Sequence, residues 1–212
     1  MLFVYPFIKI KNDMTRRQKF YLPFKRLIGI FGSLVGIIFC FIILWWWVIP
    51  VNAIVTKGHP FFASRRIGKN DKTFRCLKFR SMKLSTNPNL TSRDEIDESN
   101  VTGFGKFLRR TSIDETLQLF NIFAGQMAFI GPRPLINVNG DSITINLRKE
   151  NGSYKLRPGL SGLAQMHKRG NLDPETKASY DEYYFNHFSF WLDTKLFFQT
   201  IFGVCGRKDD TK

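Results

Sequence analysis

The chain has 212 residues, of which 32 are Lys or Arg and 17 are Asp or Glu, so its formal net charge is +15. This length suffices for a globular domain with a hydrophobic core, and the 43% of apolar residues exclude general disorder. The three cysteines are too widely spaced to predict a disulfide framework or a structural zinc site. The basic excess predicts an anionic partner, namely nucleic acid, lipid headgroups or a phosphorylated substrate.

A membrane helix is predicted near the N-terminus. Residues 1–26 form a basic leader, which is expected either to lie on cytoplasmic headgroups or to be a loose tail. Residues 27–56 carry no charged side chain. As one helix they would span about 45 Å, more than the roughly 30 Å hydrocarbon core of a bilayer. A buried core helix is the less favoured alternative.

The charges on either side of this segment bear on its topology. Lys and Arg dominate both residues 9–26 before it and residues 57–72 after it. The positive-inside rule would keep both ends in the cytoplasm, which one straight span cannot satisfy. We therefore expect a re-entrant helix, and the alternative is a spanning helix in which one basic flank is overridden. Pro50 lacks an amide donor and is expected to bend or break the helix near its end.

Residues 57–205 are expected to form a cytoplasmic domain, followed by a polar tail at 206–212. A basic β-hairpin is predicted where the domain begins, between residues 60 and 83. Its strands are expected at Phe61–Arg65 and Thr73–Met82, and the Gly-Lys-Asn-Asp sequence between them is typical of a turn.

Beyond the hairpin the chain is predicted to be mostly helical, so the expected fold class is α/β with helix predominating. Residues 85–102 are polar and acidic and predict a loop. Apolar residues recur at helical spacing through 104–127 and predict one helix. The aromatic segment 174–204 predicts an amphipathic helix lying in the membrane interface, with a packed core helix as the alternative.

A short segment within the predicted 104–127 helix, Thr111–Glu115, allows two interpretations. Ser112 followed three residues later by Glu115 is the pattern of a capping box, which predicts a helix N-terminus. Alternatively, Asp114 is a carboxylate nucleophile or a metal ligand, at a helix end where a phosphate would also dock.

Two arginines lie beside prolines. Arg133 stands between two prolines and Arg157 precedes one, so the local backbone is fixed and the guanidinium is placed at low entropic cost. Arginine holds phosphate through two parallel hydrogen bonds. The histidines have no metal-ligand spacing, and the sequence contains no Walker loop, GxSxG or GxGxxG motif.

Taken together, these motifs resemble one family, the bacterial sugar transferases known as monotopic phosphoglycosyl transferases. The resemblance runs from about Lys25 to Cys205, and it rests on the order of its motifs rather than on any single one. The motifs are Phe62–Arg66 with Gly68, Lys78–Met82, Arg109–Glu115, Gln118–Asn121, Gly131–Pro134, Arg157–Gly162, and Tyr183–Tyr184 before Ser189–Asp193.

The resemblance implies a two-step reaction at the bacterial inner membrane, with the catalytic domain facing the cytoplasm. Asp114 would attack the β-phosphate of a UDP-sugar, UMP would leave, and a covalent phosphosugar–enzyme intermediate would form. A polyprenyl phosphate, such as undecaprenyl phosphate, would then take the phosphosugar and so begin glycan assembly. Glu115 would assist, and Mg²⁺ bound at Asp114 would neutralise phosphate charge.

The resemblance also implies further site residues and partners. Asp181 and Asp193 fall at acidic family positions and are expected either to support the site or to form structural salt bridges. Anionic membrane lipids are expected partners, and a homo-oligomer is left open. Nucleic acid is not expected, because no recognition helix is evident. The expected substrate and phosphate contacts are Arg66, Lys78, Arg80, Arg133, Arg157 and Gln165.

The sequence departs from the family pattern in three places. The Ser-Pro pair in the middle of the membrane helix is absent, Ser64 replaces a Gln, and Leu163 replaces a Trp. The alternative function is therefore a non-catalytic membrane-bound interaction protein with the same fold, in which Asp114 could be replaced without loss. No residue indicates which sugar is transferred or which glycan is built.

Overall fold

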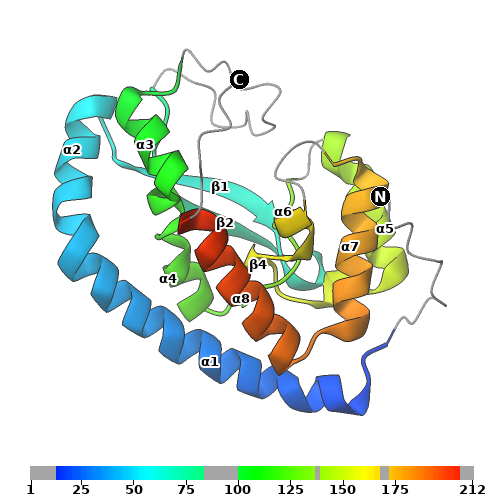
Figure 1. Ribbon diagram of the computed structural model, residues 1–212. Helices are drawn as coiled ribbons and strands as arrows, with labels where there is room; N and C mark the ends of the chain where they lie inside the picture. Colours follow the sequence, from blue (N-terminus) through cyan, green and yellow to red (C-terminus); the bar gives the residue numbers. More distant parts are fainter. Residues whose placement is uncertain (1–12, 84–99, 137–138, 168–171, 206–212) are drawn as a thin grey trace.

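The computed structural model describes residues 13–83, 100–136, 139–167 and 172–205. A long, bent N-terminal helix holds the remaining elements on its concave side (Figure 1). The helices are α1 (Arg16–Cys40), α2 (Trp46–Thr56), α3 (Gly103–Thr111), α4 (Gln118–Phe123), α5 (Asn139–Asn151), α6 (Leu163–His167), α7 (Pro174–His187) and α8 (Phe190–Cys205). The strands are β1 (Phe61–Ile67), β2 (Thr73–Phe79), β3 (Ala128–Ile130) and β4 (Gly159–Ser161).

The expectation of a mostly helical fold with a long apolar N-terminal helix is confirmed. Two small sheets accompany the helices: the antiparallel pair β1–β2 and the parallel pair β3–β4. Most of the loop predicted at 85–102, the first part of the basic leader and the polar tail lie outside the described residues.

The long helix begins before the uncharged segment and bends in its middle. A capping box starts α1, because the Thr15 hydroxyl accepts from the Gln18 amide N–H and the Gln18 side chain accepts from the Thr15 N–H. A π-helical turn at Phe41–Trp45 joins α1 to α2, where the chain changes direction (Figure 1). Pro50 lies inside α2, which continues to its end unbroken. The prediction that Pro50 bends or breaks the helix is therefore wrong, and the bend lies at the π turn, a feature that commonly bends helices.

The two sides of this helix have different surroundings. Glycines on the inner side allow close approach of the domain, because a Cβ at Gly32 would lie 2.8 Å from the Phe129 ring and one at Gly36 would lie 3.1 Å from Leu119. Large apolar side chains are exposed elsewhere on α1, the π turn and α2: Phe20, Phe24, Leu27, Ile28, Phe31, Leu34, Val35, Ile38, Phe39, Phe41, Ile42, Ile43, Trp46, Val51, Ile54 and Val55.

This exposure separates the long helix from the core helix of a soluble protein. Of the most apolar window within residues 16–56, only 17% is buried. Helix α8 is also two-sided, since Trp191 and Phe202 are 78% and 70% exposed whereas Leu196 is 2% exposed. The segment predicted as one helix over 174–204 is instead divided into α7 and α8, and of these α8 packs one face on the domain and presents an aromatic face outward.

The predicted hairpin is present, with Phe61 opposite Phe79 and Ile67 opposite Thr73. Its second strand ends at Phe79, earlier than expected, because the next residues turn toward α3. There the Ser81 carbonyl accepts from the Thr102 amide. One core lies between the hairpin, α2, α3 and α4, and a second lies between α7, α8 and the N-terminal part of α1.

The prediction of one helix over residues 104–127 is wrong. Helix α3 ends at Thr111 because Ser112 adopts a left-handed backbone with φ of 58° and donates its N–H to the Arg109 carbonyl. Among the described residues Ser112 makes no side-chain capping bond, so the predicted capping box with Glu115 is also wrong. A 3₁₀ turn, Ile113–Glu115, precedes α4. The break lets α3 pack on α2 while α4 packs on α1.

The close contact between α3 and Ser81 predicts an asymmetric response to two alanine substitutions. A Cβ at Gly105 would lie 2.1 Å from the Ser81 carbonyl oxygen, whereas no described atom lies within 4 Å of a Cβ at Gly103. We expect Gly105→Ala to lower the free energy of unfolding by about 2 kcal/mol or more, since backbone must shift. Gly103→Ala should change it by less than about 1 kcal/mol. Denaturant unfolding of both variants in detergent tests this, and equal effects would contradict the described packing.

Candidate active site

Asp114 is buried at the break between α3 and α4. The left-handed Ser112 and the 3₁₀ turn that follows carry its carboxyl group inward, where it is 8% exposed. Burial raises the pKa of Asp114 to about 6, and the neighbouring charge of Glu115 adds to the rise while Lys78 and Arg109 oppose it. A buried carboxyl group with a raised pKa among cations is typical of functional sites.

Glu115 and Lys78 form the polar edge of this site. Their side chains make an ion pair with Nζ to Oε1 at 2.6 Å, and both are partly exposed. Lys78 lies at the end of β2, which Asn121 holds in place: its Oδ1 accepts from the Leu77 N–H at 3.0 Å, and its Nδ2 donates to the Arg75 carbonyl at 2.7 Å. Asn121 therefore fixes the strand that carries Lys78.

Sequence reasoning gave Asn121 no role of its own. The signal that could have found it is a polar residue within the apolar sequence of α4, because a buried amide needs hydrogen-bond partners. Its long-range partners on β2 could be identified only from the structure.

Two predicted arginines, Arg66 and Arg133, lie close to the dyad formed by Asp114 and Glu115. Burial raises the pKa of the Cys76 thiol, and the charges of Lys78, Arg66, Glu115 and Arg133 also act on it, so these four groups lie in one neighbourhood. Burial lowers the pKa of Arg66, and the charge of Arg133 adds to this effect whereas Glu115 opposes it. The fold thus brings cations from β1, β2 and the loop after β3 to one place.

Ser64, which stands where the resemblance predicts Gln, also contributes at this place. Its hydroxyl accepts a hydrogen bond from Arg66 Nε at 3.1 Å. Arg66 further approaches the Pro134 carbonyl, at 3.5 Å. The shorter side chain therefore still orients Arg66.

Arg157 is held in a different set of contacts. Its Nε donates to the Gly125 carbonyl at 2.8 Å, and no ion pair joins it to a carboxylate of the described residues. Burial lowers the pKa of Arg157, and the charge of Arg26 adds to this effect. The charge of Arg157 in turn adds to the lowering of the Lys69 pKa by burial. It lines a pocket between α1 and the start of β4. The cations lining this pocket are Lys25, Arg26, Lys69, Lys155 and Arg157.

Arg80 and Gln165 make local contacts. Arg80 Nε donates to the His59 carbonyl at 2.9 Å, and its guanidinium lies over the Phe62 ring. The Gln165 Oε1 atom is buried and lacks a hydrogen-bond partner within the described part of the chain.

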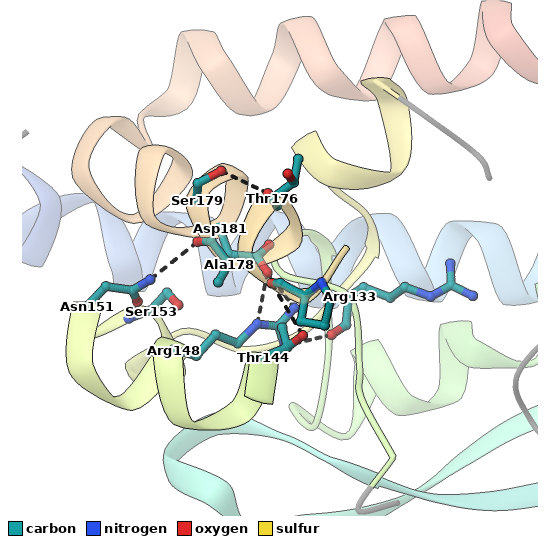
Figure 2. A network of polar contacts seen from close by, with 10 residues as sticks. Arg133, Thr144, Arg148, Asn151, Ser153, Thr176, Ala178, Ser179 and Asp181 are labelled. Atoms are coloured by element: carbon teal, nitrogen blue, oxygen red, sulfur yellow. Dashed lines mark hydrogen bonds and ion pairs between the residues drawn. The ribbon is translucent and has the colours of Figure 1, made fainter. Parts of the chain in front are cut away.

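The two supporting acids lie in ion pairs between helices. Asp181 on α7 contacts Arg148 on α5 (Figure 2). Asp193 on α8 contacts Lys25 on α1, with Nζ to Oδ2 at 2.7 Å, and accepts from the Tyr21 hydroxyl at 2.9 Å. Both contacts join α-helices far apart in sequence, as structural salt bridges do.

The dyad offers ligands of the kind that Mg²⁺ prefers. The described residues contain no group of three or more His, Cys, Asp or Glu side chains that could enclose a metal ion. Magnesium, however, is commonly held by one or two carboxylates together with substrate phosphates. Asp114, with Glu115 beside it, therefore fits a magnesium ion whose remaining ligands come from a phosphorylated substrate, and such a charge would offset the cost of ionising Asp114.

Comparison with known proteins identifies the family. Residues 20–207 match the family model described as bacterial sugar transferase. The chain belongs to the bacterial sugar transferase family. It is 36% identical over 197 residues to an uncharacterized sugar transferase of Haemophilus influenzae, covering 83% of this chain and 39% of that protein.

Two further relatives carry functional names. The chain is 32% identical over 167 residues to a UDP-galactose-lipid carrier transferase of Erwinia amylovora, covering 72% of this chain and 34% of that protein. It is 36% identical over 152 residues to a UDP-glucose:undecaprenyl-phosphate glucose-1-phosphate transferase of Klebsiella pneumoniae, covering 69% of this chain and 33% of that protein. The aligned part of this sugar transferase thus spans a third to two fifths of these relatives.

The raised pKa of Asp114 predicts that its charge destabilises the fold. The pKa of about 6 exceeds the ordinary 3.8, so ionisation at pH 7 costs the folded state up to about 3 kcal/mol. In metal-free protein, Asp114→Asn should therefore raise the free energy of unfolding at pH 7. The gain should vanish as the pH falls below about 4, where wild-type Asp114 is protonated in both states.

Unfolding in detergent at several pH values measures this gain. Asp173→Asn is the control, because the hydrogen bond from the Thr176 N–H lowers the pKa of Asp173, so its charge does not oppose folding and the variant should show no such gain. An Asp114→Asn gain that stays constant with pH, or no gain at all, would contradict the assigned burial.

Proposed function

We propose that this sugar transferase moves a sugar 1-phosphate from a UDP-sugar to undecaprenyl phosphate. The observation that carries the proposal is the buried Asp114 carboxyl group, set beside Glu115 and near the cations Lys78, Arg66 and Arg133. Family membership and the printed names of the relatives support the same reaction class.

In the proposed first step, an Asp114 carboxylate oxygen bonds to the β-phosphorus of the UDP-sugar. The bond from that phosphorus to the bridging oxygen breaks, and its electron pair leaves with UMP. With a pKa of about 6, Asp114 is mostly ionised at pH 7 and poorly solvated, which favours attack. Lys78, Arg66 and Arg133 reduce the repulsion between the two anions.

In the proposed second step, an oxygen of undecaprenyl phosphate attacks the same phosphorus and Asp114 leaves as a carboxylate. Glu115 is proposed to assist by accepting the proton that a protonated acceptor phosphate loses, since it is partly exposed and held by Lys78. Mg²⁺, held at Asp114, would supply charge neutralisation of the phosphate oxygens.

The membrane location is proposed from the exposed apolar surface. The outward faces of α1, α2 and α8 carry large apolar side chains, and both ends of the long helix are basic. We propose that both ends lie on the cytoplasmic side and that the π turn at Phe41–Trp45 lies deepest in the bilayer. The bend in Figure 1 supports this re-entrant path, and a spanning helix is the alternative.

The first test is UMP release and lipid-linked sugar formation, measured over a panel of UDP-sugars with undecaprenyl phosphate and Mg²⁺. The names of the relatives make UDP-glucose and UDP-galactose the first choices. Wild type should be active on at least one sugar, and Asp114→Asn should reduce kcat by about 10³-fold or more, because the nucleophile is lost.

Asp173→Asn is the matched control. Asp173 caps α7 by accepting from the Thr176 N–H, and asparagine caps equally well, so activity should stay within about twofold. Full activity of Asp114→Asn would exclude Asp114 as the nucleophile. Inactivity of wild type on every sugar would favour the non-catalytic interaction protein.

A further inference from the structure

The loop that carries Arg133 is held from outside rather than by its own hydrogen bonds. The flanking prolines have no N–H, so they cannot donate backbone hydrogen bonds within the loop. The Pro132 carbonyl accepts from the Gly159 N–H at 2.8 Å, and the Leu135 carbonyl accepts from the Ile67 N–H at 2.8 Å. These two contacts fix the loop on either side of Arg133 by means of backbone amides.

The carbonyl of Arg133 itself is held by a buried side chain. Arg148 Nη1 donates to this oxygen at 2.9 Å, and Arg148 on α5 is 8% exposed. Figure 2 shows the Arg133 side chain leaving in the direction away from Arg148. Arg148 therefore contacts only the backbone of Arg133, while the Arg133 guanidinium stays exposed on the other side.

Asp181 fixes the guanidinium of Arg148. Arg148 Nε and Nη2 both donate to Asp181 Oδ2, at 2.8 and 2.5 Å, and Asp181 on α7 is 2% exposed. With Nε and Nη2 turned to the carboxylate, the planar group presents Nη1 to the Arg133 carbonyl. A lysine ammonium cannot reproduce this fixed arrangement of donors.

Packing of α5 on α7 has other support. The Asn151 side chain donates to the Ala178 carbonyl at 3.3 Å, and the Thr144 hydroxyl donates to the Pro174 carbonyl at 3.4 Å. A buried ion pair is in addition a poor source of stability, since apolar residues of similar volume often replace one without loss. The distinctive effect of this pair is the donor that it directs at Arg133.

We infer that Arg148 is a positioning residue, which together with Asp181 holds the Arg133 backbone so that the Arg133 guanidinium faces the substrate phosphates beside Arg66. This inference rests on the proposed function only through the role given to Arg133. It adds α5 and α7, which carry no proposed catalytic group, to the elements that determine the affinity for the UDP-sugar.

The test replaces both charges together. Arg148→Met with Asp181→Leu removes the donor without leaving a buried unpaired charge, so we expect a folded protein with a Tm near that of wild type. The KM for the UDP-sugar should rise about tenfold while kcat stays within about threefold, because a binding contact is loosened. If the double variant does not fold, Arg148→Lys takes its place, because it keeps the buried charge of Asp181 paired. In Arg148→Lys the KM for the UDP-sugar should rise by less than tenfold.

Two further variants show whether Arg148 acts through Arg133. Arg133→Ala should raise KM by itself, and adding the Arg148→Met, Asp181→Leu pair to it should raise KM no further. Thr144→Val is the matched control between the same helices, and it should leave KM unchanged whatever it does to Tm.

Three results would overturn the inference. One is a folded double variant, or a folded Arg148→Lys, with an unchanged KM while Arg133→Ala raises it. Another is a KM rise that adds in full to that of Arg133→Ala. A third is an unchanged KM in Arg133→Ala, which would show that Arg133 does not bind the substrate. The proposed reaction is tested separately, by Asp114→Asn.

Discussion

The position of Asp114 depends on one face of the long N-terminal helix. Its outer face is apolar and exposed, so its inner face must hold the domain. Arg26 on α1 donates to the Ile122 carbonyl at 2.6 Å, at the C-terminal end of α4. Trp45 in the π turn donates to the Thr116 hydroxyl at 3.0 Å, just before α4 begins. The helix therefore holds both ends of α4, and Asp114 lies in the turn that enters it.

In the proposed function, this arrangement would couple membrane association to chemistry. Trp45 is buried and stacks on Phe120, with ring centroids 5.3 Å apart, whereas its neighbour Trp46 is 67% exposed. In the proposed re-entrant path, the bend of the helix therefore contacts α4 on one side and lipid on the other. An acceptor whose phosphate is anchored at the bilayer surface would meet Asp114 without leaving the membrane.

The burial of Asp114 explains why the site is built of opposing charges. Ionising a carboxyl group that is buried away from water costs free energy, and the positive charges of Lys78 and Arg109 offset part of that cost. Lys78 is also paired with Glu115, so it balances two acids rather than one. In the proposed reaction, a magnesium ion that binds with the UDP-sugar would add further positive charge beside Asp114.

Local signals in the sequence were sufficient for some of these features. The hairpin was predictable because its strands and turn are adjacent in the chain, and the ordered motifs led to Asp114 and Glu115 by resemblance. The capping box at Ser112 was mispredicted, because the sequence pattern does not report that Ser112 is left-handed. That conformation ends α3 where the backbone of Gly105 fits against Ser81.

Other features depend on long-range pairing, which no local pattern encodes. Parallel pairing of β3 with β4 places the Gly131 loop against Gly159, and a Cβ on Gly159 would lie 2.2 Å from the Gly131 nitrogen. Arg148 and Asp181 come to Arg133 from two separate helices. Sequence position alone therefore identified Arg133 as a candidate but not the groups that hold it.

The central claim is that Asp114 becomes covalently bound to the phosphosugar. The most direct measurement is intact-protein mass spectrometry followed by peptide mapping, on the detergent-purified protein mixed with Mg²⁺ and its active UDP-sugar, without acceptor. The account predicts a mass increase of one sugar phosphate on the peptide containing Asp114, which undecaprenyl phosphate then removes. Turnover without any adduct, or an adduct on a different residue, would contradict it.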